Sequence, residues 1–433
     1  MELEACHSSP ASWKRKSIDS VCAKFTSGGT PSRRCPWYYT NGTIPWVKTQ
    51  ELQDGLITQT EELITDEAVA NSSAKVLPAG TILLAMYGAT VGQLGVLSRP
   101  MTCNQACAAM VVDANQADRD FLYYLLLQHR SQIKSLATGA AQQNLSGLQI
   151  KQFILPFPEV SVQARIGSML RTLDDKIELN GRINETLEAI ARAIFKDWFV
   201  EFGPTRAKAE GRAAYLAPEV WALFPDRLDD DDKPKGWKDG WLGDVAENVG
   251  ESVKPDEMSP DTPYIGLEHM PRRSIALNSW EGAGKVTSGK LAFHRGDFLF
   301  GKLRPYFHKV GIAPLDGICS TDILVLGPKT PAVAAFVLSC ISTDEFVVYT
   351  DQTSGGTKMP RTSWEVMARY PLALPSEYVL QAFQHTVAPM LDRIVANIHE
   401  ASSLAQTRDL LLPKLMSGEI RLRDAEKVLE QVA

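Results

Sequence analysis

The stretch QARIGSMLRTLDDKI at Gln163–Ile177 occurs again, in weaker form, as QAFQHTVAPMLDRIV at Gln381–Val395. Apolar side chains recur in these copies every three or four residues, which is the period of an amphipathic α-helix. The second copy begins 218 residues after the first, about half the chain length. A duplicated helix at this distance predicts that a larger unit is duplicated and that the same offset holds elsewhere.

The offset holds in the segments that precede the helix. Matching pairs are GTIPWVKTQEL with DTPYIGLEHM (Gly42–Leu52 and Asp261–Met270), VLPAGTILLAMYGATVGQLGVL with LAFHRGDFLFGKLRPYFHKVGIA (Val76–Leu97 and Leu291–Ala313), and TGAAQQNLSGLQIKQFILPFP with SGGTKMPRTSWEVMARYPLALP (Thr138–Pro158 and Ser354–Pro375). The shift stays between 216 and 218 residues over most of the chain. The sequence therefore predicts a tandem duplication whose unit is far longer than a solenoid repeat.

Each half changes its pattern once. Residues Trp13–Phe157 contain short apolar runs rich in β-branched and aromatic residues between glycine and proline turns, which indicates a β-rich block with a few helices, such as Phe121–Ala137. After Pro158 the helical period continues for about 40 residues, or nearly 60 Å of α-helix. The second half repeats this helix from about Glu377, with Pro389 expected to kink it or delay its start. The fold class is therefore expected to be α+β, with two tandem β-rich domains joined and spaced by two long antiparallel helices.

The long helices are expected to pair with each other. An apolar stripe of this length is unstable in water alone, and a second such helix in the same chain can cover it as in a coiled coil. The alternative is that each helix packs separately onto its own block, and Asn180 and Asn184 either fix the register of the pair or face solvent. The side chains expected to pair the helices are Ile166, Leu170, Leu173, Ile177, Leu187, Ile194, Trp198, Val387, Leu391, Ile394 and Ile398.

The expected domain boundaries follow from these pattern changes. They are a first domain at 1–158, a first long helix at 159–201, an acidic linker at 202–236, a second domain at 237–375, a second long helix at 376–416 and a C-terminal tail at 417–433.

Composition indicates a soluble globular chain of the cytoplasm. The 433 residues are 44% hydrophobic and 22% charged, the N-terminal stretch has no apolar core of signal-peptide length, and no apolar run approaches the length of a membrane span. Seven cysteines in irregular spacing favour reduced thiols, and the lone pair Cys103 and Cys107 is interpreted as core or surface thiols rather than as a metal site.

The net charge of −6 hides an uneven distribution. Trp13–Lys151 carries 13 Lys and Arg against 10 Asp and Glu, whereas Lys233–Arg369 carries 16 of each. The negative charge therefore lies outside the two blocks, which leaves a polyanion-binding face possible on each of them.

The ordered motifs resemble the specificity subunit of type I restriction–modification systems. They run SGGTPSR, NGTIPWVKTQEL, LPAGTILLAMYGATVG, CNQACAAM, TGAAQQNLSGLQIKQFILPFP and QARIGSMLRTLDDKIELN, and the second half repeats a weaker version that closes with LLLPKLMSGEI. The resemblance covers roughly Trp13 to Ile420.

This resemblance implies two target-recognition domains held apart by antiparallel helices, each reading one half of a split double-stranded DNA target. It also implies that two modification (methyltransferase) subunits and a restriction (translocase and nuclease) subunit are the partners. Those partners would bind S-adenosylmethionine, ATP and Mg²⁺, and this chain would bind no cofactor and no membrane.

The residues themselves indicate no catalytic site. There is no NPPY-like or DPPY-like tetrapeptide, no FxGxG-like turn and no GxxxxGK[ST] phosphate loop. Pro225-Asp226 and Asp231-Asp232-Lys233 superficially resemble a metal nuclease motif, but they lie in the acidic linker and are interpreted as solvated charge. The chain is therefore expected to catalyse nothing alone and to hold no metal.

Basic and amide side chains in loops are the candidates for DNA contact, because arginine pairs with guanine and Asn or Gln with adenine. KLRPYF at Lys302–Phe307 also interleaves basic and aromatic residues, which suits phosphate contact or stacking. The candidates are Arg33, Arg34, Lys48, Gln50, Gln142, Gln143, Asn144, Arg272, Arg273, Lys302, Arg304, Tyr306, Lys358 and Arg361.

GTIPWVKTQEL is interpreted as a proline-led edge strand whose Trp46 packs inward. Lys48 and Gln50 lie an even number of residues from Trp46, so in a regular strand they would share its buried face. Their contact with DNA therefore requires the strand to break at or after Trp46.

Two other functions remain open at this stage. One is a DNA-modifying or DNA-cleaving enzyme with fused recognition domains, which predicts metal-dependent cleavage that Asp232→Ala abolishes. The other is a scaffold whose blocks bind proteins, which predicts binding that is insensitive to Arg304→Ala and Arg361→Ala.

Overall fold

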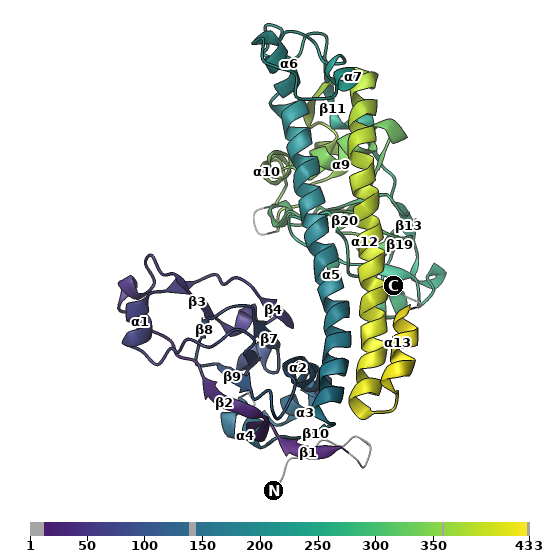
Figure 1. Ribbon diagram of the computed structural model, residues 1–433. Helices are drawn as coiled ribbons and strands as arrows, with labels where there is room; N and C mark the ends of the chain where they lie inside the picture. The colour runs from purple at the N-terminus through teal and green to yellow at the C-terminus, as the bar shows by residue number, and fades with distance from the viewer. Residues whose placement is uncertain (1–12, 138–143, 357–358, 431–433) are drawn as a thin grey trace. The chain divides into compact units, whose positions relative to one another are not determined.

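The computed structural model of the chain, shown in Figure 1, describes residues 13–137, 144–356 and 359–430. The chain divides into two compact units. The first contains Met1–Asp175 together with Leu404–Ala433, and the second contains Lys176–Ser403. Each unit therefore holds one β-rich domain and a segment of each of the two long helices.

The first domain is built on a five-stranded sheet of order β2-β9-β6-β7-β4 and a three-stranded sheet of order β5-β3-β8, with β1 and β10 forming a separate pair. The strands are β1 (Lys14–Ser17), β2 (Cys22–Ser27), β3 (Ile44–Val47), β4 (Gly55–Ile57), β5 (Leu63–Ile64), β6 (Ile82–Ala85), β7 (Leu94–Leu97), β8 (Thr102–Cys103), β9 (Cys107–Val112) and β10 (Ile154–Phe157). The helices are α1 (Asp66–Ala70), α2 (Arg119–Gln128), α3 (Arg130–Ser135) and α4 (Gly147–Gln152). β6 and β7 are buried throughout, as their continuous apolar sequences predict.

The expectation that GTIPWVKTQEL forms an edge strand is wrong. β3 lies between β5, which pairs with it antiparallel, and β8, which pairs with it parallel. Pro45 fits this central position although proline lacks a backbone donor, and its carbonyl accepts the hydroxyl of Thr102 at 2.8 Å. Trp46 does pack inward: it is buried, and its Nε1 donates to the Gly29 carbonyl at 2.9 Å.

The second domain repeats these pairings in a four-stranded sheet of order β12-β20-β17-β18, a five-stranded sheet of order β13-β16-β19-β14-β15 and the pair β11 and β21. The strands are β11 (Lys238–Trp241), β12 (Ala246–Asn248), β13 (Glu251–Val253), β14 (Pro263–Ile265), β15 (Glu281–Gly282), β16 (Lys290–Phe293), β17 (Phe298–Gly301), β18 (Val310–Ile312), β19 (Gly317–Cys319), β20 (Ile323–Pro328) and β21 (Pro371–Leu374). The helices are α6 (Gly203–Ala209), α7 (Pro218–Trp221), α8 (Leu242–Val245), α9 (Ala334–Ile341), α10 (Asp344–Gln352) and α11 (Trp364–Met367).

The strand register agrees with the duplication. Leu83 pairs with Ala109 between β6 and β9, and Leu299 pairs with Val325 between β17 and β20, so both partners shift by 216 residues. The parallel pair β3 and β8 likewise has its counterpart in the parallel pair β14 and β19. The offset found in the sequence therefore also relates the hydrogen-bonded strand partners of the two domains.

The long helices are α5 (Val160–Phe195) and α12 (Glu377–Ser417). A π-helical turn at Lys196–Val200 extends α5, so Trp198 lies just beyond its regular part. α12 begins upstream of Pro389, and its start is therefore not delayed.

Within the second unit the two helices run antiparallel. Asn397 donates to Asn184 Oδ1 at 2.8 Å, and one helical turn away Asn180 donates to Glu400 Oε2 at 3.2 Å. The residue numbers rise along one helix as they fall along the other, as expected for antiparallel neighbours. Asn180 and Asn184 are both buried, so they do not face solvent.

The same helices also pack onto the β-rich domains. Contact between the two helices and contact of each helix with a domain therefore occur together. In the first unit Ile166 and Leu170 of α5 share a core with Leu411 and Leu415 of α12 and with Phe121 of the first domain. Gln163 Oε1 accepts the Asp118 amide at 3.0 Å, which seats α5 against the N-terminus of α2. A side chain at Gly167 would meet Asp118 Oδ1 at 2.6 Å, so glycine permits this close approach.

In the second unit an aromatic cluster holds the end of α5 to the domain. Phe199 contacts Phe336 and Phe383 with ring centroids 4.9 Å apart in each case, and Trp198 contacts Phe224 at 5.1 Å. Phe224 belongs to the stretch expected as an acidic linker, so this stretch is anchored rather than fully solvated and includes α6 and α7.

The C-terminal tail also has structure, because it forms α13 (Leu422–Glu430). Its buried Ala425 belongs to the core of the first unit. Arg165 on α5 binds Glu426 at 2.8 Å, which adds a polar tie between the tail and the first long helix.

Candidate DNA-recognition surfaces

In the first domain Arg33 is held by an acid and two rings. Its guanidinium forms two hydrogen bonds with Glu62, at 2.6 and 3.0 Å, and stacks over Tyr39 at 4.2 Å and over Trp46 at 5.2 Å. The hydrogen bond from Arg33 lowers the pKa of Glu62 and, reciprocally, raises the pKa of Arg33. This bidentate, stacked geometry fixes the guanidinium in one orientation.

The strand that contains Trp46 ends before Lys48, which is the condition for Lys48 to leave the buried face. β3 ends at Val47 and a 3₁₀ turn begins at Thr49, so Lys48 leaves the strand and is only partly buried. Its Nζ binds Glu61 at 2.7 Å and Glu62 at 3.2 Å. Lys48 and Arg33 thus share Glu62, which reduces the positive charge that either presents to a phosphate.

The remaining candidates of the first domain are dispersed. Arg34 and Gln50 are exposed, and Asn144 is exposed where it forms an isolated β-bridge with Tyr87. Gln142 and Gln143 lie outside the described residues. The structure therefore brings Arg33 and Lys48 together and leaves their role in DNA contact a prediction.

In the second domain several candidates gather around Phe307. The guanidinium groups of Arg272 and Arg304 lie 4.2 and 5.9 Å from the Phe307 ring, and Tyr306 packs edge-on against it at 4.8 Å. Arg273 follows directly and binds Asp344 at 2.8 Å. KLRPYF therefore places Arg304 and the exposed Tyr306 beside Phe307, and Arg272 from another loop lies over the same ring.

The backbone holds these arginines in uncommon conformations. Arg273, Arg304 and His308 have φ values of 59°, 52° and 51°, in the left-handed region that non-glycine residues rarely adopt. Arg304 N donates to the Pro360 carbonyl at 2.8 Å, and Arg273 N donates to the His308 carbonyl at 2.9 Å. Such strain persists only where surrounding contacts enforce it, and it is frequent at functional sites.

Lys302 and Arg361 belong to the same surface. The loop at Lys302 pairs with the loop at Arg361, because Thr362 N donates to the Lys302 carbonyl at 3.1 Å, and Arg361 binds Asp322 at 3.1 Å. Lys358 lies outside the described residues. The structure thus groups Arg272, Arg273, Arg304 and Tyr306 around Phe307, and Lys302 and Arg361 on the loop that Arg304 also contacts.

Sequence reasoning missed the acids that hold these cations. Glu61, Glu62, Asp322 and Asp344 bind candidates from 13 or more residues away in sequence, so no local motif identifies them. It also missed Glu188, a buried carboxylate of α5 that contacts the second domain. Its one sequence signal is that Glu188 directly follows Leu187 of the predicted apolar stripe.

The supposed nuclease motif does not assemble. Asp226 binds Lys208 at 3.3 Å, Asp232 binds Arg206, and Lys233 binds Asp239 at 2.6 Å. Lys233 also lies 3.7 Å from Asp231, but Asp226 and Asp232 bind other cations, so the motif forms exposed ion pairs and no single cluster, as expected for solvated charge.

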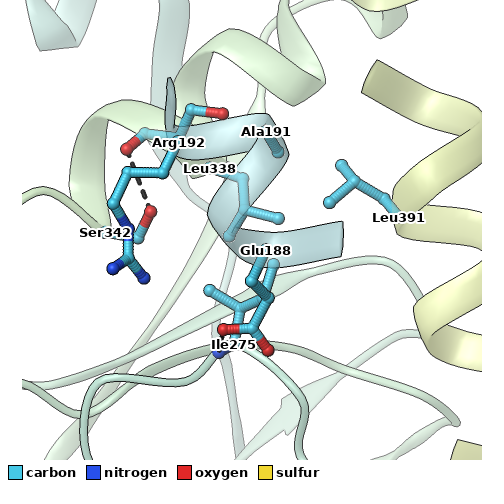
Figure 2. Close-up of a pocket in the computed structure, with 8 residues that line it drawn as sticks. Glu188, Ala191, Arg192, Ile275, Leu338, Ser342 and Leu391 are labelled. Atoms are coloured by element: carbon cyan, nitrogen blue, oxygen red, sulfur yellow. Dashed lines mark hydrogen bonds between the residues drawn. The ribbon is translucent and has the colours of Figure 1, made fainter. Parts of the chain in front are cut away.

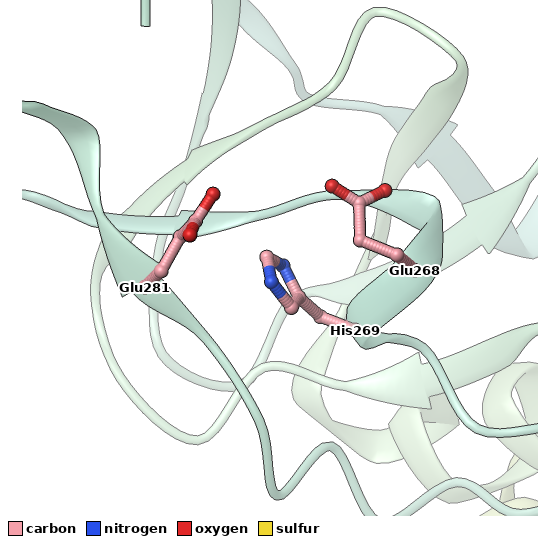
Figure 3. Close-up of side chains that lie close together, drawn as sticks. All are labelled: Glu268, His269 and Glu281. Carbon is pink, nitrogen blue, oxygen red and sulfur yellow. The ribbon is translucent and has the colours of Figure 1, made fainter. Parts of the chain in front are cut away.

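One cluster of potential metal ligands occurs among the described residues (Figure 3). Ligand atoms of Glu268, His269 and Glu281 lie within 4.8 Å of one another, and both glutamates are exposed. His269 Nδ1 accepts the Gly266 amide at 2.9 Å, so this nitrogen has a structural partner. Exposed acids commonly gather in this way without binding a metal.

No single helix within 13–137, 144–356 or 359–430 is long and apolar enough to cross a membrane. One bent pair of helical segments, Pro331–Ile341 and Asp344–Gln352, reaches the required length and composition when taken together.

The fold and these surfaces define a class of protein. It carries two copies of a β-rich domain, clusters of basic and aromatic side chains on loops, and two long helices that run antiparallel within the second unit. Residues 10–189 match the family described as "Type I restriction modification DNA specificity domain".

Relatives of known name extend this match over nearly the whole chain. The chain is 26% identical to the type I restriction enzyme MjaIX specificity subunit of Methanocaldococcus jannaschii, over 96% of this chain and 95% of that protein. It is 25% identical to the type I restriction enzyme HindI specificity subunit of Haemophilus influenzae, over 72% of this chain and 80% of that protein.

A solved structure agrees with the fold. The specificity subunit of a type I restriction–modification system from M. genitalium superimposes with a TM-score of 0.58 at 16% identity, over 93% of this chain and 96% of that one. The resemblance to type I specificity subunits and the α+β fold are thereby confirmed.

Proposed function

We propose that each β-rich domain reads one half of a bipartite double-stranded DNA target, and that the chain positions partner methyltransferase subunits on that target. The observation that carries this proposal is the repeated strand register, in which Leu83–Ala109 recurs as Leu299–Val325. Two copies of one domain with different loops suit two half-sites of different sequence.

The lengths of the helices are compatible with a split target. α5 has 36 residues and α12 has 41, so each is about 54 to 62 Å long at 1.5 Å per residue. One turn of DNA is about 34–36 Å. Helices of this length can span the interval between half-sites about one turn apart, with an unread spacer between them.

The second domain offers the stronger candidate surface. Arg272, Arg304 and Tyr306 around Phe307 combine cations for phosphate or guanine with an exposed ring, which suits contact with the DNA backbone and base edges. In the first domain, Arg33 and Lys48 are the candidates, and each must break its ion pair with Glu62 before it can contact DNA.

The catalytic parts belong to partners in this proposal. Two modification subunits bring S-adenosylmethionine, and a restriction subunit brings ATP and Mg²⁺, while this chain brings the sequence preference. The complex acts on DNA in the cytoplasm. Supporting this division, curated relatives are named as specificity subunits of restriction enzymes.

The proposal is tested by footprinting the chain together with its modification subunits on DNA that contains the target. The target is found first by mapping methylated adenines in cells with and without the chain. Two protected segments separated by an unprotected gap are expected. A single continuous footprint, or none in the presence of the partners, contradicts the proposal.

Modularity provides a second test. Exchange of Trp13–Pro158 for the corresponding block of a relative is expected to change one half-site and leave the other intact. Arg304→Ala and Arg361→Ala are expected to weaken DNA binding, with the exposed Arg369→Ala as the matched control. A change in both half-sites after the block exchange contradicts independent reading by the two domains.

A further inference from the structure

We propose that Glu188 is a positioning residue, which fixes the Arg272–Ile275 loop so that the second domain can discriminate its half-site. Glu188 lies on α5 and does not itself belong to the candidate DNA surface. This inference rests on the proposed function, because it assigns Arg272 and Arg273 to the reading of that half-site.

The carboxylate of Glu188 binds the loop with both oxygens. Oε1 accepts the Ser274 hydroxyl at 2.8 Å, and Oε2 accepts the Ile275 amide at 3.1 Å. The Glu188 residue is 6% exposed. Figure 2 shows the Glu188 carboxylate close to Ile275.

Burial of a carboxylate is costly unless the carboxylate is hydrogen-bonded, and here each oxygen of Glu188 accepts a hydrogen bond from the loop. Burial raises the pKa of Glu188, while the hydrogen bonds from Ser274 and Ile275 and the charge of Arg192 oppose that rise. A leucine at position 188 could cover Ala191 and Leu391 but could not accept two donors from a loop. The contacts therefore indicate that Glu188 fixes the conformation of the Arg272–Ile275 loop, in addition to packing α5 against the domain.

The loop is tied on its other side to the turn that carries Arg304. Arg273 N donates to the His308 carbonyl at 2.9 Å, and the Arg273 guanidinium binds Asp344 at 2.8 Å. Arg272 stacks over Phe307 at 4.2 Å. Between these ties and Glu188, the loop has little freedom to shift.

Apolar contacts already attach α5 to the domain without Glu188. Ala191, Ile275, Leu338 and Leu391 line a small cavity of about 20 Å³ next to the carboxylate (Figure 2) and belong to the same buried core. Loss of the carboxylate is therefore expected to loosen the loop before it detaches the helix.

The test uses the full chain in complex with its modification subunits and a duplex that carries the mapped target. Glu188→Gln keeps the size of the side chain but replaces one acceptor oxygen with a donor, and Ser274→Ala removes one donor from the loop. Glu185→Gln, an exposed position on α5, is the matched control. Affinity is measured for the target and for duplexes with one base pair changed in either half-site.

Glu188→Gln is expected to reduce discrimination at one half-site by about tenfold, because hydrogen bonds to a charged acceptor are stronger than neutral ones. Discrimination at the other half-site is expected to stay as in the wild type. Ser274→Ala is expected to affect the same half-site to a smaller extent, and Glu185→Gln to affect neither.

Three results overturn the inference. Equal loss at both half-sites means that Glu188 supports stability only, and thermal unfolding of the same variant then shows the corresponding shift. Wild-type discrimination in Glu188→Gln means that the loop needs no carboxylate. If the wild-type complex itself has no second half-site, the proposed function fails, and the inference fails with it; the first two results leave the proposed function standing.

Discussion

The asparagine pair between the long helices can be tested quantitatively. Asn397 and Asn184 are 0% and 6% exposed, and a 2.8 Å hydrogen bond joins them. In Asn397→Ala, Asn184 Oδ1 is left buried without its donor, which costs about 1 to 2 kcal/mol in the free energy of local opening. This cost corresponds to about 5- to 30-fold faster exchange of the amides of α5 near Asn184.

A variant with leucine at both Asn184 and Asn397 separates the effect of the hydrogen bond from the effect of side-chain packing. Asn397 Oδ1 has no hydrogen-bond partner among the described residues, so the pair is incompletely satisfied. Replacing both asparagines with leucine removes these polar atoms together, and we expect exchange near the wild-type rate or slower. The double variant therefore loses less than the two single leucine variants predict by addition.

Hydrogen exchange followed by mass spectrometry is the assay, because it reports α5 and α12 separately. Asp392→Asn, an exposed change on α12, is the control. The reasoning is refuted if Asn397→Ala leaves exchange unchanged, or if the double leucine variant loses as much as the single variants combined.

Three further predictions concern the first unit. Trp46→Phe removes the donor to the Gly29 carbonyl and is expected to cost about 1 kcal/mol of stability, measured by thermal unfolding, whereas Trp37→Phe at a 53% exposed position is expected to be neutral. The pKa of Glu62 is lowered chiefly by Arg33, so its pairing stabilises the fold above the ordinary pKa of glutamate and loses this effect as pH falls through the lowered pKa. Glu62→Gln is therefore expected to be less stable than the wild type at neutral pH and to approach it in acid, and a constant difference across pH would contradict this. Asp174 accepts a hydrogen bond from the Tyr124 hydroxyl and binds Arg408 at 2.6 Å. Asp174→Asn is expected to lower the free energy of local opening by about 1 to 2 kcal/mol, less than for a fully buried pair because both side chains are partly exposed. Amide exchange in α12 is therefore expected to become faster in Asp174→Asn and to stay unchanged in Asp175→Asn.

Features with a local period were predictable from sequence. Of the side chains that the apolar stripe predicts to pair the helices, Ile166, Leu170, Val387 and Ile394 are buried. Ile177, Leu187 and Ile194 are only partly buried, because a stripe read from spacing does not define where the contact edge lies. The duplication was also predictable, since it needs only comparison of the chain with itself.

Features that depend on distant partners were not predictable. β3 read as an edge strand because Pro45 lacks a donor, but β8, more than 50 residues later, pairs with it through Trp46 and Val47. In the same way, the sequence around Arg33 does not indicate that Glu62 forms an ion pair with it. Which cations are neutralised is decided by tertiary contacts that no local pattern contains.

The composition of the two units has a consequence for synthesis of the chain. Residues Lys176–Ser403 form one unit from a continuous segment, whereas the first unit needs Leu404–Ala433 to join Met1–Asp175. Until Leu404–Ala433 has been synthesised, Leu170 and Phe121 lack their core partners Leu411 and Leu415. We therefore expect a chain truncated after Ser403 to keep all the residues of the second unit but to leave part of the core of the first unit uncovered.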